Sequence, residues 1–391
     1  MSRLNVTAVG ALVIILVSAF SPRLRADSRH YLITTEDGLS NSSVNCILQD
    51  AEGLMWFGTW EGLNVYDGNR LKVFRNNPMD ENSLLDNIVR NVVQEDRNHF
   101  WVVTAWGVSR LDVETGKFSR YRLVTDQISS FAGEGVSLTI AADGTVFCSS
   151  NGWGLAYYDK VSERMVPFKV RDYPTSGITG VGSDGEGNLI VIGEGGEVVR
   201  ISYSFDDKQD SIDARAVETV LSPQSGSYLM ASSKDRIFFV GTRHVFEYDR
   251  LARAVVDSVS FSGTVSYAAM SPDGHLDMVA DRTSLCRVDF ESGRVFRIDS
   301  FSRDNLLSFC YGTQDIVWLG VDGEGVEACL IEPDPMRKIS SKSLFALRGG
   351  AVTSMVQTEG GDIYTSVLGN GMCLMDSLGN PKKKINISAS D

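Results

Sequence analysis

Short apolar runs separated by turns rich in glycine and aspartate follow one another along most of the chain. Runs such as VNCILQD (44–50) and NVVQED (91–96) contain β-branched residues and favour strands. A turn bearing Asp and Gly follows, then a strand of the WFGT kind, a short loop, and a strand of the GLNVYD kind. A fourth strand, such as LKVF (71–74) or KFSRY (117–121), often closes the set. The pattern predicts an all-β chain of four-stranded units.

The stretch LMWFGTWEGLNVYDG (54–68) recurs along the chain with decreasing similarity. Its copies lie at 98–116, 144–160, 187–202, 236–250, 274–290, 315–331 and 361–377. One position holds mostly large apolar residues, namely Trp56, Trp101, Phe147, Ile190, Phe239, Asp277 or Met278, Trp318 and Tyr364. Their spacing clusters in the low to middle forties, which is the length of a β-propeller blade. We expect this column to fill the wedges between neighbouring blades.

The copies predict how the chain divides into domains. Seven copies run from about 30 to 333 and predict a seven-bladed β-propeller over residues 27–333. A linker is expected at 334–348, and an eighth repeat at 349–391 forms the start of a further blade. A closed eight-bladed ring is the alternative.

The first 26 residues differ from the repeats. Arg3 precedes an apolar run from Val6 to Phe20 that is short for a membrane span, which favours a cleaved secretory signal peptide over residues 1–26. An uncleaved anchor is the rival interpretation, but it would leave more positive charge on the exported side than inside. We therefore expect a periplasmic protein.

Charge and cysteine usage narrow the function classes. The net charge is −13, and removal of residues 1–26 with their three arginines makes it −16, so phosphate backbones are repelled and nucleic acid is not an expected partner. Six cysteines are scattered at 46, 148, 286, 310, 329 and 373 in strand-like contexts. A disulfide framework is one interpretation, and free buried thiols are the favoured one.

The segment HYLITTEDGLSNSSVNCILQDAEGLMWFGTWEGLNVYDGNRLKVFRNNPMDENSL (30–84) resembles the first blade of the two-component regulator propeller family, found in periplasmic sensors of Bacteroides-type hybrid histidine kinases. The resemblance covers essentially the whole mature chain and weakens between about 170 and 300. In that family two seven-bladed propellers precede a β-sandwich, a membrane helix, a histidine kinase, a receiver and a DNA-binding region. This chain ends at Asp391 without those elements.

The resemblance implies that residues 349–391 begin a second, truncated propeller and that membrane contact belongs to the missing regions. It also implies an oligosaccharide or carbohydrate breakdown product as ligand, and a homodimer through the sensor region. The chain is then a truncated sensor, a gene fragment or a closed eight-bladed ring.

Ligand contacts are expected in the loops between the second and third strands, which share one face of a propeller with the loops joining successive blades. Flat aromatic and polar side chains in these loops could form a sugar platform, although the tryptophans could equally pack between loops. The candidates are Trp60, Glu61, Trp106, Asn151, Trp153, Glu194, Arg243, Asp281 and Arg282.

No catalytic residue, metal site or cofactor site is expected. The four histidines show no metal-ligand spacing, and DGEGN (184–188) and DGEG (322–325) lack the remaining positions of a calcium loop. The first hypothesis is therefore an exported, non-catalytic sensor propeller that binds oligosaccharides. The alternatives are a propeller-fold hydrolase or lyase acting on carbohydrate, a protein-interaction scaffold, and a non-functional sensor fragment.

Overall fold

The computed structural model describes twelve ranges of the chain: 30–123, 136–150, 154–171, 173–175, 177–206, 211–222, 228–313, 315–330, 352–358, 362–367, 371–376 and 381–385. The chain divides into two compact units, Met1–Ile331 and Glu332–Asp391. The predicted signal peptide, the predicted linker, Asn151 and Trp153 lie outside the described ranges.

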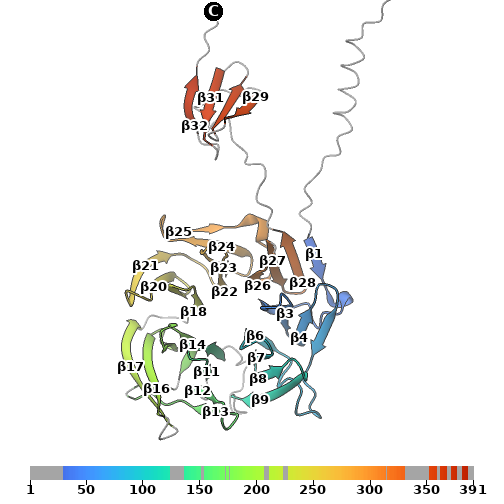
Figure 1. Ribbon diagram of the computed structural model, residues 1–391, viewed down its shortest axis with the longest axis vertical. Helices are drawn as coiled ribbons and strands as arrows, with labels where there is room; N and C mark the ends of the chain where they lie inside the picture. The colour runs from blue at the N-terminus through green and yellow to red at the C-terminus, as the bar shows by residue number, and fades with distance from the viewer. Residues whose placement is uncertain are drawn as a thin grey trace, which may run out of the picture. The chain divides into compact units, whose positions relative to one another are not determined.

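Four-stranded antiparallel sheets in the first unit surround a common centre as the blades of a propeller (Figure 1). Innermost strand first, blades one to four contain β2 (Val44–Gln49), β3 (Met55–Thr59), β4 (Gly62–Tyr66) and β5 (Leu71–Phe74); β6 (Val89–Gln94), β7 (His99–Thr104), β8 (Gly107–Asp112) and β9 (Lys117–Arg122); β10 (Ser137–Ile140), β11 (Val146–Ser150), β12 (Gly154–Asp159) and β13 (Arg164–Pro167); β14 (Ile178–Ser183), β15 (Asn188–Gly193), β16 (Val198–Asp206) and β17 (Ser211–Leu221).

The remaining blades follow the same order of strands. Blades five to seven contain β18 (Leu229–Ser232), β19 (Arg236–Val240), β20 (His244–Asp249) and β21 (Ala254–Ser260); β22 (Val265–Met270), β23 (Leu276–Ala280), β24 (Ser284–Asp289) and β25 (Arg294–Arg297); β26 (Leu306–Tyr311), β27 (Ile316–Val321), β28 (Gly325–Leu330) and β1 (His30–Ile33). The described part of the unit also contains the short 3-10 helices η1 (Thr35–Asp37) and η3 (Asp299–Phe301).

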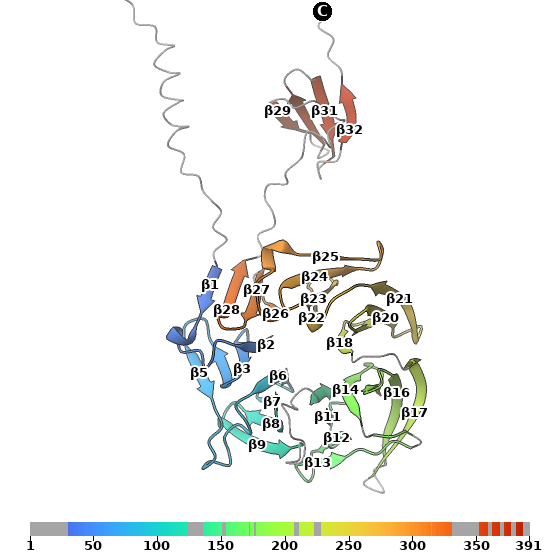
Figure 2. The same ribbon diagram turned by 180° about the vertical axis from the view of Figure 1, so that it is seen from behind.

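The ring closes through its first strand. β1 pairs antiparallel with β28, from His30 opposite Cys329 to Ile33 opposite Val326, so the N-terminal end of the propeller supplies the outer strand of blade seven. Blade seven also contacts blade one directly, because the Ser308 hydroxyl donates a 2.9 Å hydrogen bond to the Val44 carbonyl. Figures 1 and 2 show this ring from its two faces. The predicted seven-bladed propeller is confirmed.

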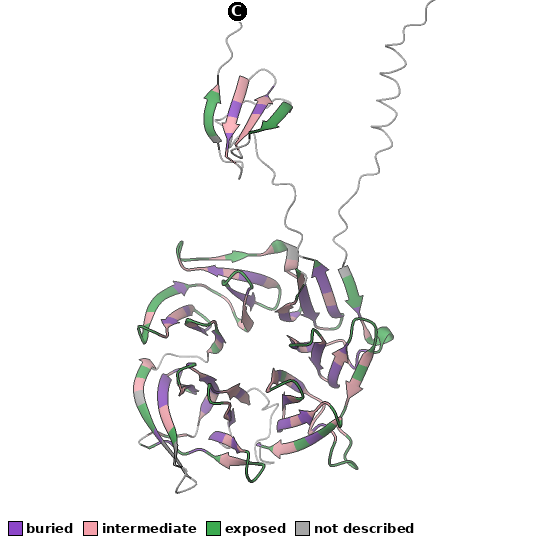
Figure 3. Cartoon of the chain, viewed as in Figure 1, coloured by how far each residue is buried: buried purple, intermediate pink, exposed green. Residues whose placement is uncertain are grey.

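Apolar side chains between the blades form the core of the ring. The second and third strands are largely buried and the outer strands are more exposed (Figure 3). Trp56 stacks on Phe100 of blade two with ring centroids 4.2 Å apart, and the Trp56 indole donates to the Asp50 carboxylate at 2.8 Å. Trp101 and Trp318 are likewise buried. The predicted packing role of the tryptophan column is thus visible at each of the three positions.

The strand register corrects one member of the column and decides between two alternatives for another. Phe238, and not the predicted Phe239, occupies the position in blade five, because the turn before β19 is one residue shorter than in blade one. Phe239 packs toward blade four instead. In blade six the register assigns the position to Asp277 and not to Met278, which packs with blade five.

The glycine of the WFGT motif has a steric cause. A Cβ added at Gly58 would lie 2.4 Å from the Cys46 sulfur and 2.6 Å from Val89 Cγ1 of the next blade. Gly320 of the WLGV sequence is equivalent, since its Cβ would lie 2.7 Å from the Val44 carbonyl oxygen. The glycine therefore lets the inner strand of one blade approach the middle of its neighbour.

The cysteines of the described ranges are free, as predicted, and five of the six are buried. Burial raises the pKa of the Cys46 and Cys148 thiols from the usual 9.0 to about 12. The folded protein therefore keeps protons that the unfolded chain loses above pH 9.

We accordingly expect the free energy of unfolding to fall as the pH rises from 9 toward 12, the interval between the unfolded and folded thiol pKa values. Urea unfolding at a series of alkaline pH values measures this slope. The Cys148→Ala variant should show a shallower alkaline slope, whatever its stability at neutral pH. An unchanged slope would mean that other groups cause the alkaline loss.

The second unit contains one further sheet with the strands β29 (Val352–Gln357), β30 (Ile363–Val367), β31 (Gly371–Met375) and β32 (Pro381–Ile385). Its order and its bulge after Val352 match those of blade one. All six residues of β29 are exposed, and Val352 is 55% exposed whereas its counterpart Val44 is fully buried. Within the described ranges, no helix has the length and apolar character needed to cross a membrane.

Candidate ligand-binding site

A β-bulge shapes the start of the inner strand in most blades. In blade one Val44 pairs with Thr59 and Cys46 with Gly58, so Asn45 is an extra residue without a partner of its own, opposite the last two residues of β3. The same shift occurs at equivalent places in four other blades of the ring. We call the five extra residues the bulge ring: Asn45, Arg90, Thr179, Ser266 and Leu307.

The bulge ring lines a central cavity of about 930 Å³. The cavity wall continues along the inner strands, for example from Thr179 to Ser183 in blade four, and reaches Gly185 and Arg250 at the turns of the opposite face. The lining also includes larger side chains, among them Tyr228 before β18, Met230 in β18 and Tyr267 directly after the bulge residue Ser266. A cavity of this size suits a small organic ligand.

Trp60 connects the loop face to this cavity. The Gly62 N–H donates to the Asn87 carbonyl at 2.8 Å, which holds the loop containing Trp60 against the start of blade two. There the Arg90 guanidinium carbon lies 5.0 Å from the centroid of the Trp60 ring, within the range of a cation–π contact. Trp60 is therefore next to a residue of the cavity wall.

Trp106 has a similar partner in a different place. The Arg122 guanidinium carbon lies 5.0 Å from the Trp106 ring centroid, and Arg122 ends the outer strand β9 of the same blade. Trp106 is 37% exposed, and Arg122 is not among the cavity-lining residues. Trp60 and Trp106 thus do not form one continuous platform, and Trp153 lies outside the described ranges.

Three other predicted contacts, Glu61, Glu194 and Arg243, have exposed side chains in their loops. The Glu61 N–H donates to Thr59 Oγ1 at 3.0 Å and its carbonyl accepts from Arg75. The Glu194 N–H donates to the Gly177 carbonyl at 2.7 Å. The backbones of these two residues fix their loops, and their carboxylates remain accessible to solvent.

Asp281 and Arg282 adopt left-handed conformations with φ of 52° and 55° in the loop after β23. The Asp281 carboxylate accepts hydrogen bonds from the Thr264 N–H at 2.8 Å and from its hydroxyl at 3.2 Å. Arg282 lines the cavity, and its guanidinium donates to the Asp322 carboxylate at 2.6 Å. Of the predicted residues in the described ranges, Arg282 is the one that reaches the cavity wall.

The bulge ring was not among the predicted ligand contacts. Strict alternation along a strand places each residue on one of the sheet's two faces, whereas a bulge adds a residue that breaks this alternation. The signal present in the sequence is positional: each member is the second residue of an inner strand, as in VNCILQ and VRNVVQ.

Residues 38–61 match the family described as the two component regulator propeller. Histidine kinase P4 of Formosa agariphila is 42% identical over 79 residues, which cover 19% of this chain and 6% of that protein.

Two solved structures share the fold. The extracellular domain of one hybrid two component system of B. thetaiotaomicron aligns with a TM-score of 0.60 and 19% identity, covering 91% of this chain and 49% of that chain. A second such domain aligns with a TM-score of 0.55 and 17% identity, covering 89% and 46%. The chain thus spans about half the length of these structures and a small part of the curated relative.

Fold and comparisons together define the chain as a β-propeller, a fold that it shares with the extracellular domains of hybrid two component systems. More particularly, the match to the two component regulator propeller covers residues 38–61, which include β2 and β3 of blade one, and it confirms the predicted resemblance.

Proposed function

We propose that the chain is the exported sensor portion of a carbohydrate-responsive two-component system and that it binds an oligosaccharide at the mouth of the central cavity on the loop face. The observation that carries this proposal is the cavity of about 930 Å³ lined by the bulge ring. Its amide and hydroxyl groups from Asn45, Thr179 and Ser266 suit sugar hydroxyls, and Trp60 supplies an aromatic surface beside them.

Export rests on residues 1–26 acting as a signal peptide with a periplasmic destination, and association into a homodimer rests on the family resemblance. We further propose that the eighth repeat is the first blade of a second propeller, joined by a linker at 334–348. In support, β29 exposes Val352, Met355 and Val356, whereas the equivalent inner strands of the ring are covered by neighbouring blades.

Calorimetric titration with a panel of oligosaccharides tests the proposal. Binding without change of the glycan is expected, whereas hydrolysis or elimination products would identify a carbohydrate-active enzyme. The Trp60→Ala variant should bind about 2- to 10-fold more weakly, because it removes an aromatic surface next to the cavity.

The matched control is Trp106→Ala, since Trp106 also stacks on an arginine, but that arginine, Arg122, ends an outer strand and does not line the cavity. This variant should bind with nearly unchanged affinity. An equal loss of affinity in both variants, or no loss in either, would contradict a site at the cavity mouth.

A further inference from the structure

The central cavity carries positive charge in an acidic protein. The chain has 50 acidic and 37 basic residues, yet the charged side chains in the described lining of the cavity are three arginines: Arg90, Arg250 and Arg282. No Asp or Glu belongs to that lining. A low-dielectric wall with charges of one sign raises the local concentration of ions of the opposite sign.

Two of the three arginines are already engaged. Arg282 is ion-paired with Asp322, and Arg250 donates a hydrogen bond to the Asp184 carbonyl. Arg90 differs, because it forms no hydrogen bond or ion pair with any described residue and its buried Nε has no partner. Its guanidinium lies over the face of the Trp60 ring. Arg90 thus holds unused donors at the cavity wall.

The fold does not require an arginine at this position. Arg90 is the bulge residue of β6, and the same position holds Asn45, Thr179, Ser266 and Leu307 in other blades. Each of these is uncharged, and each lines the same cavity. A partly buried cation without a counter-ion is costly, so an arginine here is better explained by a ligand than by packing.

We propose that the Arg90 guanidinium is an anion-binding subsite and that the ligand of the propeller carries a carboxylate or sulfate group. The location of this subsite rests on the proposed function, which places the ligand at the mouth of the central cavity. A guanidinium presents a planar fork of donors that matches two oxygens of such a group, and stacking on Trp60 fixes the plane of the fork before binding. Trp60 then has two roles, to orient Arg90 and to border the sugar.

Inorganic sulfate is the probe that does not depend on the identity of the sugar. Thermal unfolding is measured in sodium sulfate against sodium chloride of equal ionic strength for the wild type, Arg90→Leu and Arg122→Leu. Leu307 shows that leucine is compatible with the bulge position, and Arg122 is a stacked arginine away from the cavity lining.

We expect saturable stabilisation by sulfate in the wild type and in Arg122→Leu, and its loss in Arg90→Leu. Arg90→Lys should bind sulfate more weakly than the wild type because it keeps the charge but loses the fork. An identical sulfate response in the wild type and Arg90→Leu would overturn the anion subsite.

Glycans distinguish the two sources of negative charge. Uronate-containing oligosaccharides are compared with their methyl esters, and sulfated oligosaccharides with their desulfated forms. We expect the charged form of one class to bind about 10- to 100-fold more tightly, and Arg90→Leu to remove this preference. Equal binding of charged and neutral forms would overturn the anionic ligand while leaving oligosaccharide binding in place. A thermal response to sulfate without binding of any glycan would support the anion subsite and refute the proposed binding of oligosaccharides.

Discussion

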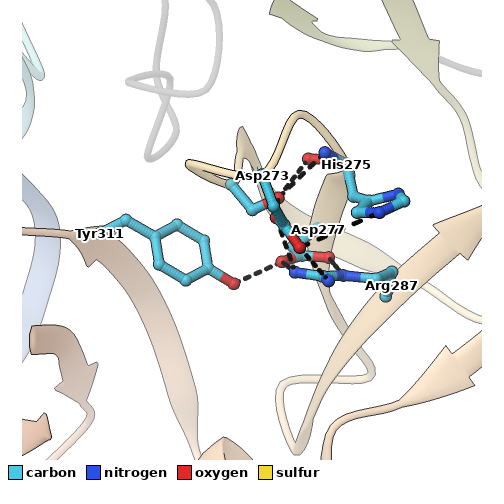
Figure 4. A network of polar contacts seen from close by, with 6 residues as sticks. Asp273, His275, Asp277, Arg287 and Tyr311 are labelled. Atoms are coloured by element: carbon cyan, nitrogen blue, oxygen red, sulfur yellow. Dashed lines mark hydrogen bonds and ion pairs between the residues drawn. The ribbon is translucent and has the colours of Figure 1, made fainter. Parts of the chain in front are cut away.

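Replacement of Arg287 by methionine is expected to lower the free energy of unfolding by about 3–5 kcal/mol. The reason is Asp277, a fully buried carboxylate between blades six and seven (Figure 4). Arg287 donates to both of its oxygens, at 2.8 Å and 2.9 Å, and the Tyr311 hydroxyl donates to it from blade seven. Without Arg287 the carboxylate remains buried with its charge uncompensated. Urea unfolding of both proteins measures the difference.

A neighbouring carboxylate supplies the matched control. Asp273 also accepts a hydrogen bond from Arg287, at 2.7 Å, but its side chain is 56% exposed. Exposed ion pairs contribute little, so Asp273→Asn should cost less than about 1 kcal/mol. Equal losses for Arg287→Met and Asp273→Asn would show that burial of Asp277 is not the cause.

Compensating substitutions separate burial of the charge from loss of packing. The column position of Asp277 is occupied by Phe147 in blade three and by Ile190 in blade four, both buried. Asp277→Ile combined with Arg287→Met and Tyr311→Phe should therefore recover most of the lost stability, because no buried polar group remains unpaired. Failure to recover would mean that the polar network specifies the contact between blades six and seven.

The propeller was predictable because its signals are local and repeated. Trp56, Trp101 and Trp318 recur at blade length, and the Asp and Gly turns mark the strand ends. The degenerate blades show the limit of such reasoning. Phe239 was misassigned because a turn shortened by one residue exchanges the two faces of the strand. The sequence pattern assigned the column position of blade six equally well to Asp277 and to Met278. The strand register assigns it to Asp277, which accepts a hydrogen bond from the Tyr311 hydroxyl.

The candidate site was predicted less completely than the fold. The loop face was the expected location, but side-chain directions within loops depend on contacts from other blades. Arg90 shows this, since it lies 30 residues beyond Trp60 and contacts it only because blade two packs against the first loop. The sequence placed Trp60 and Trp106 on one rim, whereas their arginine partners lie at an inner and an outer strand.

The two tryptophans of the first blade should respond oppositely to truncation. Trp56→Ala is expected to lower the free energy of unfolding by about 3–5 kcal/mol, because Trp56 is 1% exposed and the variant loses the stack on Phe100 and leaves a cavity between blades. Trp60→Ala should change stability by less than about 1 kcal/mol, since Trp60 is partly exposed in a loop, and should weaken ligand binding instead. Urea unfolding and calorimetric titration of the two variants measure both quantities.

Trp56→Phe provides the control for the indole. Phenylalanine keeps an aromatic ring against Phe100, as Phe147 does in the column position of blade three, but removes the hydrogen bond to Asp50. Asp50 still accepts hydrogen bonds from the Glu52 and Leu54 N–H groups, so the turn retains its cap. We therefore expect a loss well below that of Trp56→Ala. If Trp56→Phe lowers the free energy of unfolding as much as Trp56→Ala does, the contribution of Trp56 comes from its hydrogen bond to Asp50. Packing between the blades would then not explain why large apolar residues recur in the column.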